Sequence, residues 1–349
     1  IWCNKKALDM ANIQEDTPVP DGGEILKKDG LLTGILVDKA QQLIWDIIPS
    51  ESIDDVKKWI LKAQEICLSK GLTEVHDAGI SSIQFDAYKE LINENKLKIR
   101  VYAMANQELF ENNVSKYKSE LFELKSVKLV ADGALGSNGA ALIDKYQGSD
   151  TYGILILDKN KLKTLFSKAF NNDFQVCIHA IGDKANREVV LALRETLENY
   201  NDYQFDHRTR IEHAQIIKEE DLKEISDLNV IASVQPMHCI SDMYMAEERL
   251  GDRVKDSYLW KTLIDNNILL IGGSDFPVEN PSPLKGIYAA VNRTKFNNSP
   301  YGGWQSKEIL NLKEALEMYT KNTAYGSFKE NFKGNIEIGK IADFTLIDR

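Results

Sequence analysis

The feature that most constrains the fold is a repeated alternation of short apolar runs with helix-like segments. Helices are expected over Asp54–Ser69, Lys161–Asn171 and Lys184–Asn199, where apolar residues recur three and four positions apart. Because parallel strands need a long crossover connection, usually a helix, this alternation predicts an α/β fold with a parallel sheet and helices outside it. The expected strands are Gly71–His76, Ile99–Ala103, Val127–Val130, Gln175–His179, Thr209–His213, Val230–Val234 and Ile268–Gly272.

The number of strands bears on how the sheet closes. Seven such strands can be counted in the sequence, whereas a (β/α)8 barrel of the TIM type needs eight. We therefore expect a barrel whose first strand precedes Ile1, with an open sheet as the alternative. On this interpretation residues 1–50 are an insertion that follows the first strand, residues 51–330 form the barrel, and residues 331–349 supply strands of a small β-sandwich.

The two ends of the chain depart from the strand–helix pattern. A helix is expected over Trp2–Ala11, followed by an antiparallel excursion over Gly22–Leu36 with turn glycines at Gly30 and Gly34. At the other end, the glycine- and strand-rich stretch Ile336–Ile347 is expected to pack as an extra sheet.

Candidate metal ligands follow several of the expected strands. Lys128 lies within the third strand, while His179, His213 and Asp275 lie at or just beyond the ends of the fourth, fifth and seventh. His179 and His213 are 34 positions apart, about one strand–helix unit, and Asp275 lies 62 positions further on, about two units. Because parallel strands of a barrel end at one mouth, these side chains are expected to face one another there.

These residue types suit hydrolytic metal chemistry. Neutral imidazole and carboxylate groups bind zinc and similar divalent ions, and such an ion acidifies bound water to a pKa of about 7. Asp275 is placed to take a proton from the water and to pass it to a leaving nitrogen. Lys128 would join the site only if its amine were carboxylated.

Each candidate also has a structural interpretation. Single histidines on apolar strands are more often packed and hydrogen-bonded than metal-bound, although two of them one unit apart favour a site. Asp275 could instead cap a helix. Lys128 could instead form a buried ion pair with Asp132 or Glu212.

Two further histidines lie near strand ends. His76 ends the first expected strand, and His238 follows the sixth. Either could line a substrate pocket or serve the packing alone.

Composition excludes several classes of function. Lys and Arg number 43 against 53 Asp and Glu, which gives a net charge of −10, and no basic cluster suggests a nucleic-acid surface. No apolar run approaches the roughly 18 residues of a membrane-spanning helix. The four cysteines form no CxxC pair, so they are expected to be reduced thiols. We expect a cytoplasmic protein that acts on a small molecule, with a homodimer as one option for its assembly.

Six segments resemble the amidohydrolase-3 branch of the amidohydrolase superfamily, the branch of the YtcJ-like proteins and the N-substituted formamide deformylases. The C-terminal stretch 334–348 is also similar to the closing strands of that superfamily, and the opening residues 1–8 are similar to a stretch typical of the branch. The segments are GLTEVHDAG (71–79), VKLVADGALGS (127–137), IHAIGDKAN (178–186), RIEHAQ (210–215), SVQPMH (233–238) and GSDFPV (273–278).

The resemblance implies a metal-dependent hydrolase on a distorted (β/α)8 barrel. The family's lysine on its fourth strand corresponds to Lys128, its two later histidine ligands to His179 and His213, and its aspartate, both ligand and proton shuttle, to Asp275. Gln235 and His238 both fall in a segment that borders the family's substrate pocket.

One departure from the family pattern is serious. Family members carry a His-x-His pair at the end of the first barrel strand, whereas no two of the five histidines here are two positions apart. Either the sequence is a piece of a longer enzyme, which we favour, or the metal site is incomplete. Three functions remain open: hydrolysis of a C–N bond in an amide, formamide or cyclic amide, a lyase that uses Lys128 as a Schiff-base nucleophile, and a barrel without catalysis.

Overall fold

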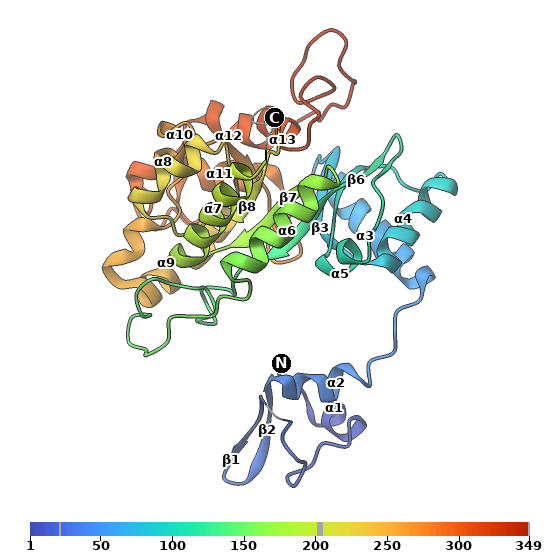
Figure 1. Cartoon of the computed structure of the whole chain (residues 1–349), viewed down its shortest axis with the longest axis vertical. Helices are drawn as coiled ribbons and strands as arrows, with labels where there is room; N and C mark the ends of the chain where they lie inside the picture. Colours follow the sequence, from blue (N-terminus) through green and yellow to red (C-terminus); the bar gives the residue numbers. More distant parts are fainter. Residues whose placement is uncertain (21, 201–204, 348–349) are drawn as a thin grey trace. The chain divides into compact units, whose positions relative to one another are not determined.

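The computed structural model describes residues 1–20, 22–200 and 205–347 (Figure 1). The chain divides into two compact units, Ile1–Val56 and Lys57–Arg349. Among the described residues, no helix has the length and apolar character needed to cross a bilayer.

The first unit is built on an antiparallel hairpin of β1 (Gly23–Lys28) and β2 (Leu31–Asp38), as expected. Its two-residue turn is Asp29-Gly30, and both residues have positive φ angles, which matches the right-handed twist of the strands. Gly34, the other expected turn glycine, lies inside β2 instead. Its φ is +85°, and a Cβ there would come 2.2 Å from the carbonyl oxygen of Cys3, so the close approach of that backbone requires glycine.

Short helices complete the first unit: α1 (Lys5–Met10), the 3-10 turn η1 (Lys39–Gln41) and α2 (Gln42–Trp45). The helix expected over Trp2–Ala11 begins only at Lys5, because the side chain of Asn4 accepts a hydrogen bond from the Ala7 amide and caps it. The unit has a small core of its own, which comprises Leu8, Ile13, Ile25, Leu36, Ala40 and Ile44.

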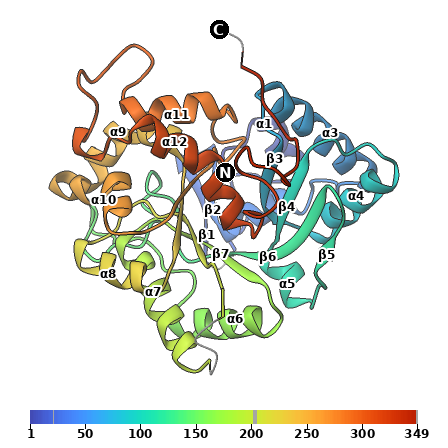
Figure 2. The same cartoon turned by 90° about the horizontal axis from the view of Figure 1, so that it is seen from above.

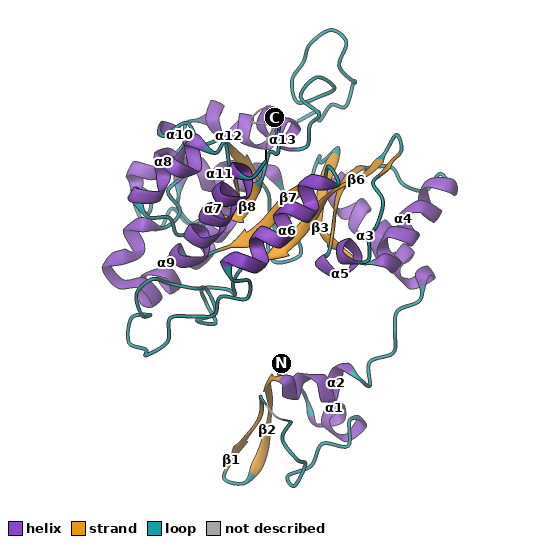
Figure 3. Cartoon of the chain, in the orientation of Figure 1, coloured by secondary structure: helices purple, strands orange, loops and turns teal. Residues whose placement is uncertain are grey.

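The second unit contains a curled sheet (Figures 2 and 3). All seven expected strands are present in it, and neighbouring strands of the seven pair in parallel. The strand order is β10-β9-β8-β7-β6-β4-β3, and the short strand β5 pairs antiparallel with β6. The sheet is a half-barrel in which β3 and β10 stand at the two ends of the order. The strands are β3 (Glu74–Ile80), β4 (Arg100–Ala105), β5 (Tyr117–Lys118), β6 (Phe122–Val130), β7 (Gln175–Ala180), β8 (Arg210–His213), β9 (Ile231–Val234) and β10 (Leu270–Gly272).

Helices follow the strands and lie around the outside of the sheet (Figure 2). The three helices expected from the apolar spacing are confirmed as α3, α6 and α7. The helices are α3 (Ile53–Ser69), α4 (Ser82–Asn93), α5 (Gln107–Glu111), α6 (Lys159–Asn171), α7 (Asp183–Glu198), α8 (Glu219–Asp227), α9 (Pro236–Leu250), α10 (Trp260–Asp265), α11 (Pro283–Asn292), α12 (Leu312–Tyr319) and α13 (Lys321–Gly326), with 3-10 turns η2 (Gly251–Asp256) and η3 (Ser306–Glu308).

The two faces of the sheet differ in chemistry. Side chains alternate between the faces of a strand, and one set, such as Val127, Leu129 and Ile178, belongs to the apolar core shared with the helices. The other set is largely polar. On the central strands it comprises Ser126, Lys128, Gln175, Cys177, His179, Arg210, Glu212 and Ser233. A polar interior that leads to the carboxyl ends of the strands is suited to a site.

The β-sandwich strands expected near the C-terminus are not found. Within the described residues, 327–347 contain no strand, and Ile336, Ile338 and Leu346 are almost fully exposed. A strand needs a neighbouring strand to pair its backbone, and within the described residues the backbone of this stretch pairs with no strand. The segment is held by side chains instead, including an Arg100–Asp343 ion pair of 2.7 Å. Residues 348–349 of the expected unit lie outside the described residues.

Candidate metal centre at the ends of the strands

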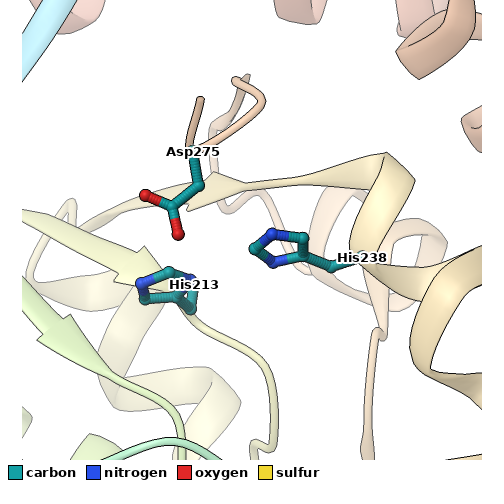
Figure 4. A group of neighbouring side chains, drawn as sticks. All are labelled: His213, His238 and Asp275. Carbon is teal, nitrogen blue, oxygen red and sulfur yellow. The ribbon is translucent and has the colours of Figure 1, made fainter. Parts of the chain in front are cut away.

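Three side chains from different elements converge beyond the carboxyl ends of the strands (Figure 4). His213 ends β8, His238 lies in the first turn of α9, and Asp275 lies in the loop after β10. One potential ligand atom of each lies within 4.8 Å of those of the other two. The Asp275 carboxylate points towards the two imidazole rings.

The backbone is unusual at two of these positions. His213 has a φ of +78° and Asp275 a φ of +54°, a left-handed region that residues with a Cβ seldom adopt. The turn at His213 also interrupts the alternation of β8, and its ring comes to lie 4.5 Å, between centroids, from that of His179. Such strain is common where a backbone is held to aim a functional side chain.

Gln235 fixes the orientation of the His213 ring. Its side-chain oxygen lies 2.9 Å from Nδ1 of His213, while its amide nitrogen donates to the backbone oxygen of Ser233. Nδ1 therefore donates, and Nε2 carries the lone pair. Burial lowers the pKa of His213 well below its usual range, with contributions from the charges of His179, Lys128 and His238. A neutral ring with a fixed lone pair is suited to bind a metal ion.

His238 supplies the second imidazole. Its ring stacks on that of His213 at 6.1 Å between centroids, and its buried Nε2 makes no hydrogen bond within the described part of the chain. Two imidazoles and a carboxylate form a donor set that zinc and related divalent ions accept. The unpaired nitrogen and the donor chemistry thus fit a divalent cation.

His179 lies beside this group but is not one of its three members. Its Nε2 faces Oδ1 of Asp132 and the backbone oxygen of Gly133, each at 3.4 Å. The structure therefore brings His213 and Asp275 together as expected, with His238 rather than His179 as the third member.

Lys128 forms neither of the ion pairs considered for it. Glu212 pairs with Arg210 at 2.9 Å, and Asp132 is occupied by backbone amides and His179. Across the residues that the structure describes, the Lys128 amine forms no hydrogen bond or ion pair. It lies on the polar face of β6, level with Cys177 of β7.

His76 lies apart from the metal-ligand group, in a buried charged network. Its Nδ1 is 2.9 Å from a guanidinium nitrogen of Arg210, and its Nε2 is 3.4 Å from Oε1 of Glu74. Burial lowers the pKa of His76 to about 4, with Glu74 opposing the shift and Arg210 adding to it. These contacts give no support to the pocket role proposed for His76. Gln235 and His238, by contrast, both lie at the candidate metal centre.

Sequence reasoning missed two features of the site. The orienting role of Gln235 could not be inferred, because it depends on how the chain turns after β9. Asp132 was considered only as a partner for Lys128, yet it is fully buried against His179. The signal for it was an aspartate placed directly after an apolar strand and before Gly133.

The thiols agree with the expectation from the sequence. All four cysteines are free, and Cys67, Cys177 and Cys239 are buried.

Comparison with known proteins identifies the fold and the family. A structure of an uncharacterized metal-dependent hydrolase from Pyrococcus horikoshii OT3 is 29% identical, with a TM-score of 0.84, and the match covers all of this chain and 69% of that one. The putative amidohydrolase YtcJ of Bacillus subtilis (strain 168) is 34% identical over 99% of this chain, and the N-substituted formamide deformylase of Arthrobacter pascens is 24% identical over 100% of this chain.

The chain spans 66% of the length of each of these two relatives. The sequence pattern of the amidohydrolase family, Amidohydro_3, matches residues 1–349. The match covers every residue of the chain, and the fold is shared with a metal-dependent hydrolase. The group of two histidines and an aspartate beyond the strand ends is consistent with both findings. The chain therefore belongs to the amidohydrolase family.

Proposed function

We propose that the protein is a metal-dependent hydrolase that cleaves a C–N bond in an amide, formamide or cyclic amide of small size. The observation that carries the proposal is the convergence of His213, His238 and Asp275 at the mouth of the half-barrel. The 24% identity to an N-substituted formamide deformylase supports this choice of bond.

In this proposal His213, His238 and Asp275 hold a divalent ion, with zinc as the expected metal. His179 is a further donor from β7, and Lys128 becomes one only if its amine is carboxylated. When bound, the ion acts as a Lewis acid that acidifies water and polarises the substrate carbonyl.

The remaining chemistry belongs to the chain itself. Asp275 is exposed at the mouth, so its carboxylate can reach solvent and substrate. We assign Asp275 two steps. Its carboxylate takes a proton from the attacking water and then delivers that proton to the leaving nitrogen, so that an amine departs. Gln235 keeps the His213 ring in the orientation that this arrangement needs.

One observation favours a second candidate function, a Schiff-base lyase. In the described part of the chain the Lys128 amine forms no ion pair or hydrogen bond, which leaves it available as a nucleophile. That reaction leaves the three converging side chains without a role, so we rank it second. Borohydride trapping of a substrate carbonyl on Lys128 would favour it over hydrolysis.

Amine release from an N-substituted formamide and from a simple acyl amide tests the hydrolase. The zinc-loaded protein should release amine, and Asp275→Asn should lower turnover by about 10²-fold or more, the usual contribution of a general acid–base group. Glu279→Gln is the matched control. Glu279 lies in the same loop, but its carboxylate accepts a hydrogen bond from the hydroxyl of Ser241. Near-normal turnover in Asp275→Asn would refute the assignment of Asp275.

A further inference from the structure

Asp132 is the buried carboxylate that joins two loops of the site. It follows β6 and is completely inaccessible to solvent. Its Oδ2 accepts hydrogen bonds from the amides of Ala141 and Gly182, both at 2.8 Å, and its Oδ1 accepts one from Ile181 at 3.0 Å. Ala141 belongs to the loop after β6, whereas Ile181 and Gly182 belong to the loop after β7. One side chain thus fixes both loops to each other.

The same carboxylate faces a histidine. Oδ1 of Asp132 lies 3.4 Å from Nε2 of His179, and the backbone oxygen of Gly133 lies equally far from that nitrogen. Both groups can only accept from a nitrogen that carries a proton. In the neutral form of the ring, these two acceptors therefore place the proton on Nε2 and leave the lone pair on Nδ1.

His213 is oriented in the opposite sense. Its Nδ1 donates to Gln235, so its lone pair is on Nε2. The two neighbouring rings, 4.5 Å apart between centroids, are thus fixed by different partners in different tautomers.

We propose that Asp132 is a positioning residue for the metal centre: it selects the tautomer of His179 and holds the two loops that flank this ring. The inference rests on the proposed function, because it gives the orientation a purpose in binding the ion. Loss of a partner of this kind usually lowers metal affinity by about 10- to 100-fold.

The metal-free protein provides a first test, in which the tautomers are read on the unaltered chain and a variant serves only to assign the signals. Two-dimensional ¹⁵N NMR of the imidazole rings at neutral pH distinguishes the two tautomers, and His179→Gln assigns the signals. We expect His179 to be protonated on Nε2 and His213 on Nδ1. A His179 ring protonated on Nδ1 would overturn the proposal.

Cobalt binding to the purified protein provides the second test, read from the visible absorption of the ion. Asp132→Asn should weaken cobalt binding by about 10- to 100-fold and disturb the His179 tautomer. Asp183→Asn is the matched control. Asp183 is also buried and accepts amide hydrogen bonds at 2.9 Å from Ile143 and Lys184, but it contacts no histidine.

The outcomes separate the two proposals. Equal weakening of cobalt binding in both variants would show that Asp132 acts only on the loops and would overturn its positioning role. Failure of the unaltered protein to bind cobalt would contradict the proposed function, whereas the tautomer of His179 would still decide the role of Asp132.

Discussion

The buried His76 predicts a specific loss of stability in mild acid. Burial lowers the pKa of His76 from 6.5 to about 4, since the ring is enclosed between Arg210 of β8, Glu74 of β3 and the Tyr102 ring of β4. The unfolded chain therefore binds a proton at higher pH than the folded protein does. Between these two pKa values stability must fall as the pH falls.

The size of the effect follows from the two pKa values. Protonation of a histidine with a pKa of 6.5 unfolded and about 4 folded removes about 2 kcal/mol between pH 7 and pH 5, and about 3 kcal/mol by pH 4. The lowered pKa of Glu74, about 2, makes its own contribution below pH 4.5, so the interval from pH 7 to 5 largely excludes it. Burial also lowers the pKa values of His207 and His213, but these two rings contribute equally to the unaltered protein and to a variant at His76, so the difference between the two proteins reports on His76.

Urea unfolding at pH 7, 6 and 5 measures this slope. The unaltered protein should lose about 2 kcal/mol more than His76→Gln over the interval. Tyr102→Phe is the control, because it alters the packing beside the imidazole without removing it, and it should keep the steep dependence. Parallel curves for the unaltered protein and His76→Gln would refute a neutral, buried His76.

Three further predictions follow from burial and close contacts. Lys333→Met leaves the buried carboxylate of Glu74 without its ion-pair partner and should cost about 3–5 kcal/mol in urea unfolding, whereas Lys223→Met, which removes an exposed pair, should leave the urea midpoint almost unchanged. Gly182→Ala places a Cβ 1.9 Å from a backbone oxygen, so it should destabilise by about 1–3 kcal/mol and lower the melting temperature. Cys3 should react with a thiol reagent in the native protein, and the three other cysteines only after unfolding.

The sheet could be predicted from the sequence because its signals are local. Buried parallel strands form apolar runs, as Leu269-Leu270-Ile271 does, and each is followed by an amphipathic helix. The C-terminal strands were predicted from the same kind of signal, and that prediction is not confirmed. The apolar alternation of residues 336–347 describes what a strand would contain, but a strand also needs a partner, which no local pattern supplies.

The site was predictable to the level of the strand ends. Parallel topology brings His213 and Asp275 to one mouth, and the spacing of the strands shows this. It does not show which way a ring turns. The positive φ of His213 and the hydrogen bonds of Gln235 and Asp132 decide that His238 joins the group and that His179 faces a carboxylate. These contacts arise from loops whose paths depend on the whole fold.

Anomalous diffraction at the zinc edge, from a crystal grown with zinc, tests the central claim most directly. We predict one strong peak bonded to Nε2 of His213, to His238 and to Asp275, with Nδ1 of His179 as the further donor and zinc–nitrogen distances of about 2.0–2.1 Å. A zinc ion bound elsewhere, or the absence of any peak between these three side chains, would contradict the metal centre proposed for this chain.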